Sequence, residues 1–117
     1  MAVTLHVDTA AWEAMVAGVW AAYDDLIPVV KGNGYGFGRS WLAQEASRRG
    51  ATDVAVGTVF EMGDALGLGL RPIVLTPSLD LDSVKVPRSA VLTVGTSAQL
   101  DQALRFVPLG AISVKVA

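Results

Sequence analysis

Residues 28–38 have the sequence Pro28-Val29-Val30-Lys31-Gly32-Asn33-Gly34-Tyr35-Gly36-Phe37-Gly38, in which glycine occupies every second position after a lysine. The apolar residues before this lysine predict a buried strand from Leu26 to Lys31. A lysine at the carboxyl end of such a strand would be desolvated, which favours the neutral amine that attacks a carbonyl group. The glycines allow the main chain to turn sharply or to approach a ligand closely. We therefore predict a candidate active site at this strand end.

The spacing of the glycines differs from that of two common phosphate-binding motifs. A dinucleotide-binding loop has the pattern G-x-G-x-x-G, but Phe37 and Arg39 stand where its third glycine would be. A P-loop has its lysine after the glycines and a serine or threonine next to it, whereas Lys31 comes before them. Residues 28–39 therefore contain neither nucleotide-binding motif.

The composition indicates one small, apolar domain. The chain has 117 residues, of which 52 % are hydrophobic and 17 % are charged, and its net charge is −2. We expect no nucleic-acid or membrane partner, because there is no basic cluster and no apolar stretch reaches the roughly 20 residues that span a bilayer. Cysteine is absent and His6 is the single histidine, so we expect no metal site. We expect a cytoplasmic protein without a signal peptide.

Segments rich in Val, Ile and Leu alternate with amphipathic segments along the chain. The predicted strands are residues 4–8, 26–31, 53–56, 73–75, 90–94 and 111–116. Helices are predicted after Asp8 or Thr9, over residues 40–49, over residues 58–66 and from residue 96 to about residue 105, with a weak helical turn over residues 79–85. Capping boxes begin two of these helices, at Thr58 with Glu61 and at Thr96 with Gln99. The first helix has an apolar stripe that we interpret as core packing, formed by Trp12, Met15, Val16, Val19 and Trp20.

This alternation predicts an α/β fold with a parallel sheet. Five of the predicted strands follow the first helix, and each of the four gaps between them contains a helix or a helical turn. A complete (β/α)8 barrel of the TIM type has eight strands and about 250 residues. We therefore expect a partial (β/α)8 barrel, roughly its first half, with parallel strands alternating with helices.

The motif Val30-Lys31-x-Asn33-x-Tyr35-Gly36-x-Gly38 resembles the cofactor-lysine motif of the alanine racemase family. Members of this family bind pyridoxal 5′-phosphate (PLP) in an eight-stranded βα barrel that is followed by a β domain. The resemblance implies that Lys31 forms the internal aldimine with PLP and that Tyr35 contacts the cofactor phosphate. The family usually has alanine at the positions of Gly32 and Gly34 and histidine at the position of Phe37.

Three further segments are similar to the same family. Residues 50–61 look like its second βα unit, residues 72–75 like its third strand, and residues 112–116 like a strand on which a lysine is often carbamylated. Lys115 is at the position of that lysine. The resemblance implies that residues 1–117 are the N-terminal portion of a PLP-binding barrel domain. It also implies that the C-terminal half barrel and the β domain are absent.

The resemblance implies a PLP-dependent amino-acid racemase, an isomerase that most simply interconverts L- and D-alanine. Racemisation needs acid/base groups on both faces of the substrate, and Lys31 would serve one face. In the family the other base is a tyrosine from the β domain of the second subunit of a homodimer. We therefore expect the parent protein to act on a small amino acid as a homodimer, and this chain alone to be inactive.

Two alternatives remain open at the level of the sequence. One is a different PLP barrel enzyme, either a decarboxylase or a racemase of another amino acid, because Phe37 replaces the histidine of the family. The other is a non-catalytic PLP-binding fragment. For Lys31 or Lys115 considered alone, a solvated lysine at a strand end is the simplest interpretation.

Overall fold

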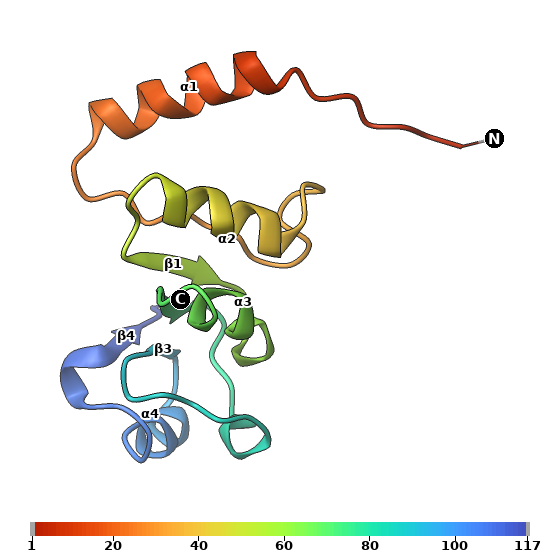
Figure 1. The fold of residues 1–117 in the computed structure, drawn as a ribbon. Helices are drawn as coiled ribbons and strands as arrows, with labels where there is room; N and C mark the ends of the chain where they lie inside the picture. Colours follow the sequence, from red (N-terminus) through yellow and green to blue (C-terminus); the bar gives the residue numbers. More distant parts are fainter. Residues whose placement is uncertain (1, 117) are drawn as a thin grey trace.

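Four short segments rich in β-branched residues form a parallel sheet in the computed structural model, which describes residues 2–116 (Figure 1). The strands are β1 (Asp53–Val56), β2 (Arg71–Val74), β3 (Val91–Val94) and β4 (Ile112–Val114). Their order in the sheet is β1-β2-β3-β4, and every neighbouring pair is parallel. The predicted α/β fold with a parallel sheet is therefore confirmed.

One helix that precedes β1 and two helices that lie between strands in sequence cover one face of the sheet. They are α2 (Arg39–Arg48), α3 (Gly63–Leu66) and α4 (Ser97–Ala103), with single 3-10 turns at η1 (Val59–Glu61), η2 (Leu81–Ser83) and η3 (Leu109–Ala111). Connections between adjacent parallel strands are almost always right-handed, so a sheet in sequential order has its helices on the same side. The buried cluster agrees with this arrangement, because Ala46, Ala65 and Ala103 of the three helices pack in it with the sheet.

Alternation along the strands separates two faces. In the registered pairs, Val54 lies beside Pro72 and Val56 beside Val74, and all four residues are buried under the helices. The intervening residues belong to the opposite face, where Ile73 is only partly buried and Ala55, beside the edge segment, is buried. Because all connections lie on the first side, no helix within residues 2–116 covers this opposite face.

The predicted strand from Leu26 to Lys31 is reduced to a single parallel bridge. Val29 pairs with Ala55, the Val30 N–H donates to the Ala55 carbonyl at 2.9 Å, and the Ala55 N–H donates to the Pro28 carbonyl at 2.8 Å. Pro28 has no N–H to donate, so the ladder cannot extend toward the N-terminus. We call residues 28–30 the edge segment. It is a fifth parallel element, placed beside β1.

The predicted strand over residues 4–8 is wrong. These residues have no regular secondary structure, and Figure 1 shows them extending away from the rest of the chain. Leu5 is 67 % exposed although its alternation with Val7 suits a half-buried strand. A strand needs a neighbour that pairs with its N–H and C=O groups, and no backbone hydrogen bond joins residues 4–7 to another segment within the described part of the chain.

The first helix, α1 (Thr9–Ala22), begins where predicted, with the Ala11 N–H donating to the Asp8 carboxylate at 3.1 Å. Its apolar stripe is less buried than predicted, since Met15 is 63 % exposed and no residue of α1 is fully buried. The helix lies against α2 rather than the sheet, so only one side of the stripe is covered (Figure 1). Within residues 2–116, no helix has the length and hydropathy that a membrane crossing requires.

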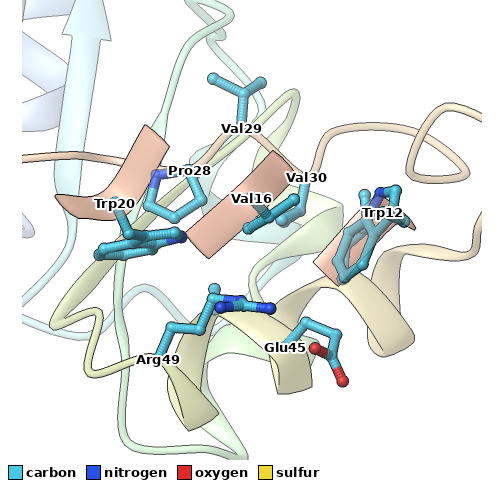
Figure 2. A pocket seen from close by; sticks show the side chains of 10 residues that line it. Trp12, Val16, Trp20, Pro28, Val29, Val30, Glu45 and Arg49 are labelled. Carbon is cyan, nitrogen blue, oxygen red and sulfur yellow. The ribbon is translucent and has the colours of Figure 1, made fainter. Parts of the chain in front are cut away.

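A small cavity of about 90 Å³ remains between α1 and α2. Figure 2 shows Trp12, Val16 and Trp20 of α1 along one side of this cavity and Glu45 and Arg49 along the other. The guanidinium of Arg49 lies 5.9 Å from the centre of the Trp12 ring, within the range of a cation–π contact. Pro28, Val29 and Val30 of the edge segment also line this cavity (Figure 2).

Candidate active site at the carboxyl edge of the sheet

Because all strands are parallel, their carboxyl ends meet at one edge of the sheet, which we call the carboxyl edge. Lys31 follows the edge segment, Gly57 follows β1, Gly95 follows β3 and Lys115 follows β4. Ligands of parallel α/β proteins bind outside this edge, because the loops there can vary without disturbing the sheet. The structure therefore places the predicted lysines at the edge where a site is expected.

Residues 31–38, the lysine loop, fold into a set of tight turns. The Gly34 N–H donates to the Lys31 carbonyl at 3.0 Å, and the Gly38 N–H donates to the Asn33 carbonyl at 2.7 Å. The Asn33 side chain also accepts from the Gly36 N–H at 3.2 Å. Asparagine commonly forms such side-chain turns, so Asn33 acts here as a turn former.

The lysine loop contains several left-handed residues. Gly34 has φ +66°, and a Cβ there would lie 2.7 Å from the carbonyl carbon of Gly38. Tyr35 has φ +56° and is the one non-glycine residue with positive φ within residues 2–116. Such conformations are uncommon for residues with a Cβ and cluster at functional sites. The turn therefore fixes Tyr35 in an unusual conformation four residues after Lys31.

The side chains of Lys31 and Tyr35 are both exposed, and Tyr35 is 64 % accessible. The prediction that Lys31 is desolvated is wrong, because no element within residues 2–116 covers this end of the edge segment. Neither the Lys31 amine nor the Tyr35 hydroxyl makes a hydrogen bond or an ion pair within the described residues. Both groups are thus available to a ligand.

Glu61 is the centre of a hydrogen-bond network beside the lysine loop. Its Oε1 accepts from the Gly32 N–H at 2.6 Å and from the Gly57 N–H at 3.3 Å. Its Oε2 accepts from the N–H and the hydroxyl of Thr58 at 2.7 and 2.9 Å. Partial burial acts to raise the pKa of Glu61, but these hydrogen bonds, led by that from Gly32, outweigh it and lower the pKa. Glu61 is therefore held as a carboxylate.

Arg39 binds the carbonyl group of Gly32, whereas Glu61 binds its N–H group. Its Nη1 donates to the Gly32 carbonyl at 2.7 Å, and its Nε donates to Oδ2 of Asp64 at 2.6 Å. The Arg39 and Glu61 side chains also approach each other, with Nη1 3.7 Å from Oε1. Both backbone polar groups of Gly32 are therefore bound by ionised side chains.

Sequence reasoning identified Glu61 only as part of a capping box and did not identify Arg39 or Asp64. The capping box is present, as predicted from the pairing of Thr58 with Glu61. A weak signal for the rest exists, because Asp64 lies one turn after Glu61 and Arg39 directly follows the lysine loop. The contact of Glu61 with Gly32 and that of Asp64 with Arg39 join residues 29 and 25 positions apart in the sequence, and no local pattern indicates them.

Lys115 lies at the carboxyl edge but far along the sheet from Lys31. It is exposed, and its N–H donates to the Val94 carbonyl at 2.8 Å. Three strands separate β4 from the edge segment, and no hydrogen bond or ion pair joins Lys115 to the lysine loop within the described residues. The structure therefore groups Lys31 with Tyr35 and Glu61, and does not bring Lys115 to them.

Comparisons of this chain with protein-family models, with curated proteins and with solved structures found no match.

Proposed function

We propose that this chain is the N-terminal part of a PLP-dependent amino-acid racemase, with alanine as the simplest substrate. The observation that supports this most is the exposed Lys31 amine, which stands at the carboxyl edge and begins a tightly turned loop that carries Tyr35. The motif resemblance adds the identity of the cofactor. The complete protein would be a homodimer with a (β/α)8 barrel.

The arrangement of the sheet supports a partial barrel. Every strand pairs with its neighbours in sequence, and the helices cover one face only. In a closed (β/α)8 barrel the helices form the outer ring and the other face of the sheet becomes the packed interior. Ile73 and Thr93, which are partly buried on the open face, would become interior residues.

The residues of the lysine loop fit PLP at two points. The cofactor aldehyde needs an accessible amine, which Lys31 supplies, and its phosphate needs hydrogen-bond donors, of which the Tyr35 hydroxyl is one. Open space of at least 4 Å surrounds the position that a Cβ would take at Gly32 and at Gly36, so a ligand can approach the backbone there.

When bound, PLP supplies an electron sink that stabilises the charge left after removal of the substrate α-proton. Lys31 Nζ would accept this proton on one face of the substrate and return it, and Tyr35 would hold the phosphate end in place. A second acid/base group is required on the opposite face. We assign that group to a β domain that residues 1–117 do not include, and expect no racemisation by this chain alone.

Reductive trapping tests the assignment of Lys31. The purified chain is incubated with PLP, reduced with borohydride and mapped by mass spectrometry, with Lys31→Ala as the matched control. We expect a pyridoxyl group mainly on Lys31 in the natural sequence, with no compensating increase at Lys85 or Lys115 in the variant. Equal labelling of all three lysines would contradict the proposal.

A further inference from the structure

Both backbone polar groups of Gly32 form hydrogen bonds with charged side chains, although Gly32 lies in an exposed loop. Its N–H donates to Glu61 Oε1 at 2.6 Å and its carbonyl accepts from Arg39 Nη1 at 2.7 Å. Asp64 in turn binds Arg39 Nε at 2.6 Å. We call Glu61, Arg39 and Asp64 the Gly32 clamp. Hydrogen bonds with ionised partners are about twice as strong as neutral ones, so this clamp is a strong local restraint.

The contact between Glu61 and Gly32 is not needed for helix capping. The capping box requires of the Glu61 side chain only that it accept from the N–H of Thr58, three residues before it. The bond to Gly32 instead spans 29 residues and joins the lysine loop to the unit that follows β1. The side chains of the clamp are 13 to 29 % exposed, so water screens them only in part.

The clamp acts directly beside Lys31. The Lys31 side chain itself has no polar partner within residues 2–116, so the only fixed part of it is the Cα–Cβ bond, whose direction is set by the backbone. The next residue is Gly32, whose φ of +64° only glycine adopts readily. Without the clamp, Gly32 would sample many conformations, and the direction of the lysine side chain would vary with them.

We propose that Glu61, Arg39 and Asp64 are positioning residues that hold Gly32 and thereby aim the Lys31 amine at the cofactor aldehyde. This inference rests on the proposed function, since it assigns a purpose to the position of Lys31. None of the three residues needs to touch the cofactor or the substrate.

The test compares three variants with the natural sequence. Glu61→Gln replaces one acceptor oxygen with an amide group, so that the donors around Glu61 cannot all be satisfied. Arg39→Met removes the donor to the Gly32 carbonyl. Thr58→Val is the matched control, because it removes the hydroxyl that donates to Glu61 Oε2 at 2.9 Å but touches neither of the two contacts to Gly32. Thermal unfolding selects a temperature at which all four proteins are equally folded.

Two readouts are taken at that temperature. The first is the hydrogen-exchange rate of the Gly32 amide without PLP, measured by NMR. The second is the ratio of pyridoxyl labelling at Lys31 to that at Lys85 after reduction with borohydride. We expect exchange roughly tenfold faster in Glu61→Gln, as for the loss of one charge-assisted hydrogen bond, and a clearly lower labelling ratio in both clamp variants. Thr58→Val should change neither readout.

The outcomes separate the two proposals. If the natural sequence labels selectively at Lys31 and the clamp variants do so equally well, the positioning role is wrong and the proposed function stands. An equal loss of selectivity in Thr58→Val would also overturn the positioning role, because general loosening would then explain it. If the natural sequence shows no selectivity for Lys31, the proposed function fails and the positioning role fails with it.

Discussion

The backbone N–H of Gly32 lies 2.6 Å from Oε1 of Glu61, although the two residues are 29 positions apart in the sequence. This hydrogen bond connects the loop that begins at Lys31 with the helical turn that follows β1. The conformation of the candidate site therefore depends on a carboxylate in the next βα unit, and several measurements follow from this dependence and from its surroundings.

Lowering the pH should reduce the free energy of unfolding, because Glu61 becomes protonated. The pKa of Glu61 is lower in the folded chain than its ordinary value of 4.5, so the unfolded chain takes up this proton first as the pH falls. The stability from its hydrogen bonds is thus complete above about pH 4.5 and is lost as the pH falls through the folded pKa. Urea unfolding across this range should show a smaller pH dependence in Glu61→Gln than in the natural sequence.

The same substitution should lower stability at neutral pH by about 1–3 kcal/mol, because partly buried donors lose their acceptor. Glu13→Gln is a suitable control, since Glu13 is half exposed and forms one ion pair within residues 2–116, with Arg48 at 3.4 Å. Equal unfolding free energies for the two variants would show that the network around Glu61 contributes nothing to stability.

Alanine should be tolerated less well at Gly34 than at Gly32. The two glycines have nearly the same φ, +66° and +64°, so backbone strain costs a similar 1–3 kcal/mol at both. A Cβ at Gly34 would in addition lie 2.7 Å from backbone atoms of Gly38, whereas a Cβ at Gly32 meets nothing within 4 Å. Denaturant unfolding of the two variants isolates the steric contribution, which should make Gly34→Ala the less stable.

This comparison also concerns the family resemblance. The alanine racemase family usually has alanine at both positions, whereas the turn seen here leaves no room for a Cβ at Gly34. If Gly34→Ala proves as stable as Gly32→Ala, the lysine loop has a second conformation. That conformation would accept alanine, which is the usual residue of the family at this position.

The ion pair between Asp53 and Arg71 should contribute measurably to the sheet. These residues are registered partners on β1 and β2, and the guanidinium contacts both carboxylate oxygens, at 2.7 and 3.2 Å. Since the Arg71 side chain is 48 % exposed, we expect Asp53→Asn to cost only about 0.5–1 kcal/mol, with a smaller effect in high salt.

The matched control for this pair is Asp82→Asn. Asp82 approaches Arg105 at 3.6 Å, and both side chains are 64 % exposed, so this substitution should have no measurable effect on unfolding. A larger loss for Asp82→Asn than for Asp53→Asn would contradict the argument from geometry and burial.

Trp12 should hold α1 to the rest of the chain. Its ring lies 5.1 Å from that of Trp41 and 6.2 Å from that of Phe37, whereas no residue of α1 is fully buried. We expect Trp12→Ala to speed hydrogen exchange throughout α1 while that of β1 to β3 is unchanged. Met15→Ala, on the exposed side of the same helix, should leave exchange in α1 unchanged. Faster exchange in the sheet of Trp12→Ala would mean that α1 is part of the core.

The purified chain should show no PLP-dependent racemisation of alanine above the rate with PLP alone. Lys31 offers one acid/base group, and inversion at the α-carbon needs a second group on the opposite face. Chiral chromatography of L-alanine incubated with the chain and PLP measures this, with Lys31→Ala as control. Turnover that disappears in Lys31→Ala would show that residues 1–117 contain both groups.

Local pattern predicted much of the sheet. β1 was predicted over the same residues, 53–56, because Val54 and Val56 alternate in a short run between glycine and a capping box. β2 begins at Arg71 rather than at residue 73, because Arg71 and Pro72 pair with Asp53 and Val54 of β1. Residues 4–8 have the same kind of alternation but no partner, and propensity alone does not make a strand.

The candidate site was predictable only where it is continuous in sequence. Lys31 and Tyr35 lie in one motif, and the structure confirms their shared loop and their place at the carboxyl edge. The contact of Glu61 with Gly32 depends on how two βα units pack, which periodicity does not encode. The exposure of Lys31 was mispredicted for the same reason, because burial of a strand end depends on elements distant in sequence.

The sequential order of the strands has a consequence for how the chain acquires its fold. Each strand pairs with one close to it in sequence, as with Asp53 and Arg71, which are 18 residues apart. Short separations make loop closure inexpensive in entropy and favour rapid folding. During synthesis each βα unit could join the growing sheet as it leaves the ribosome. The clamp on Gly32 would then form once Glu61 and Asp64 had emerged, before β2 to β4 had left the ribosome.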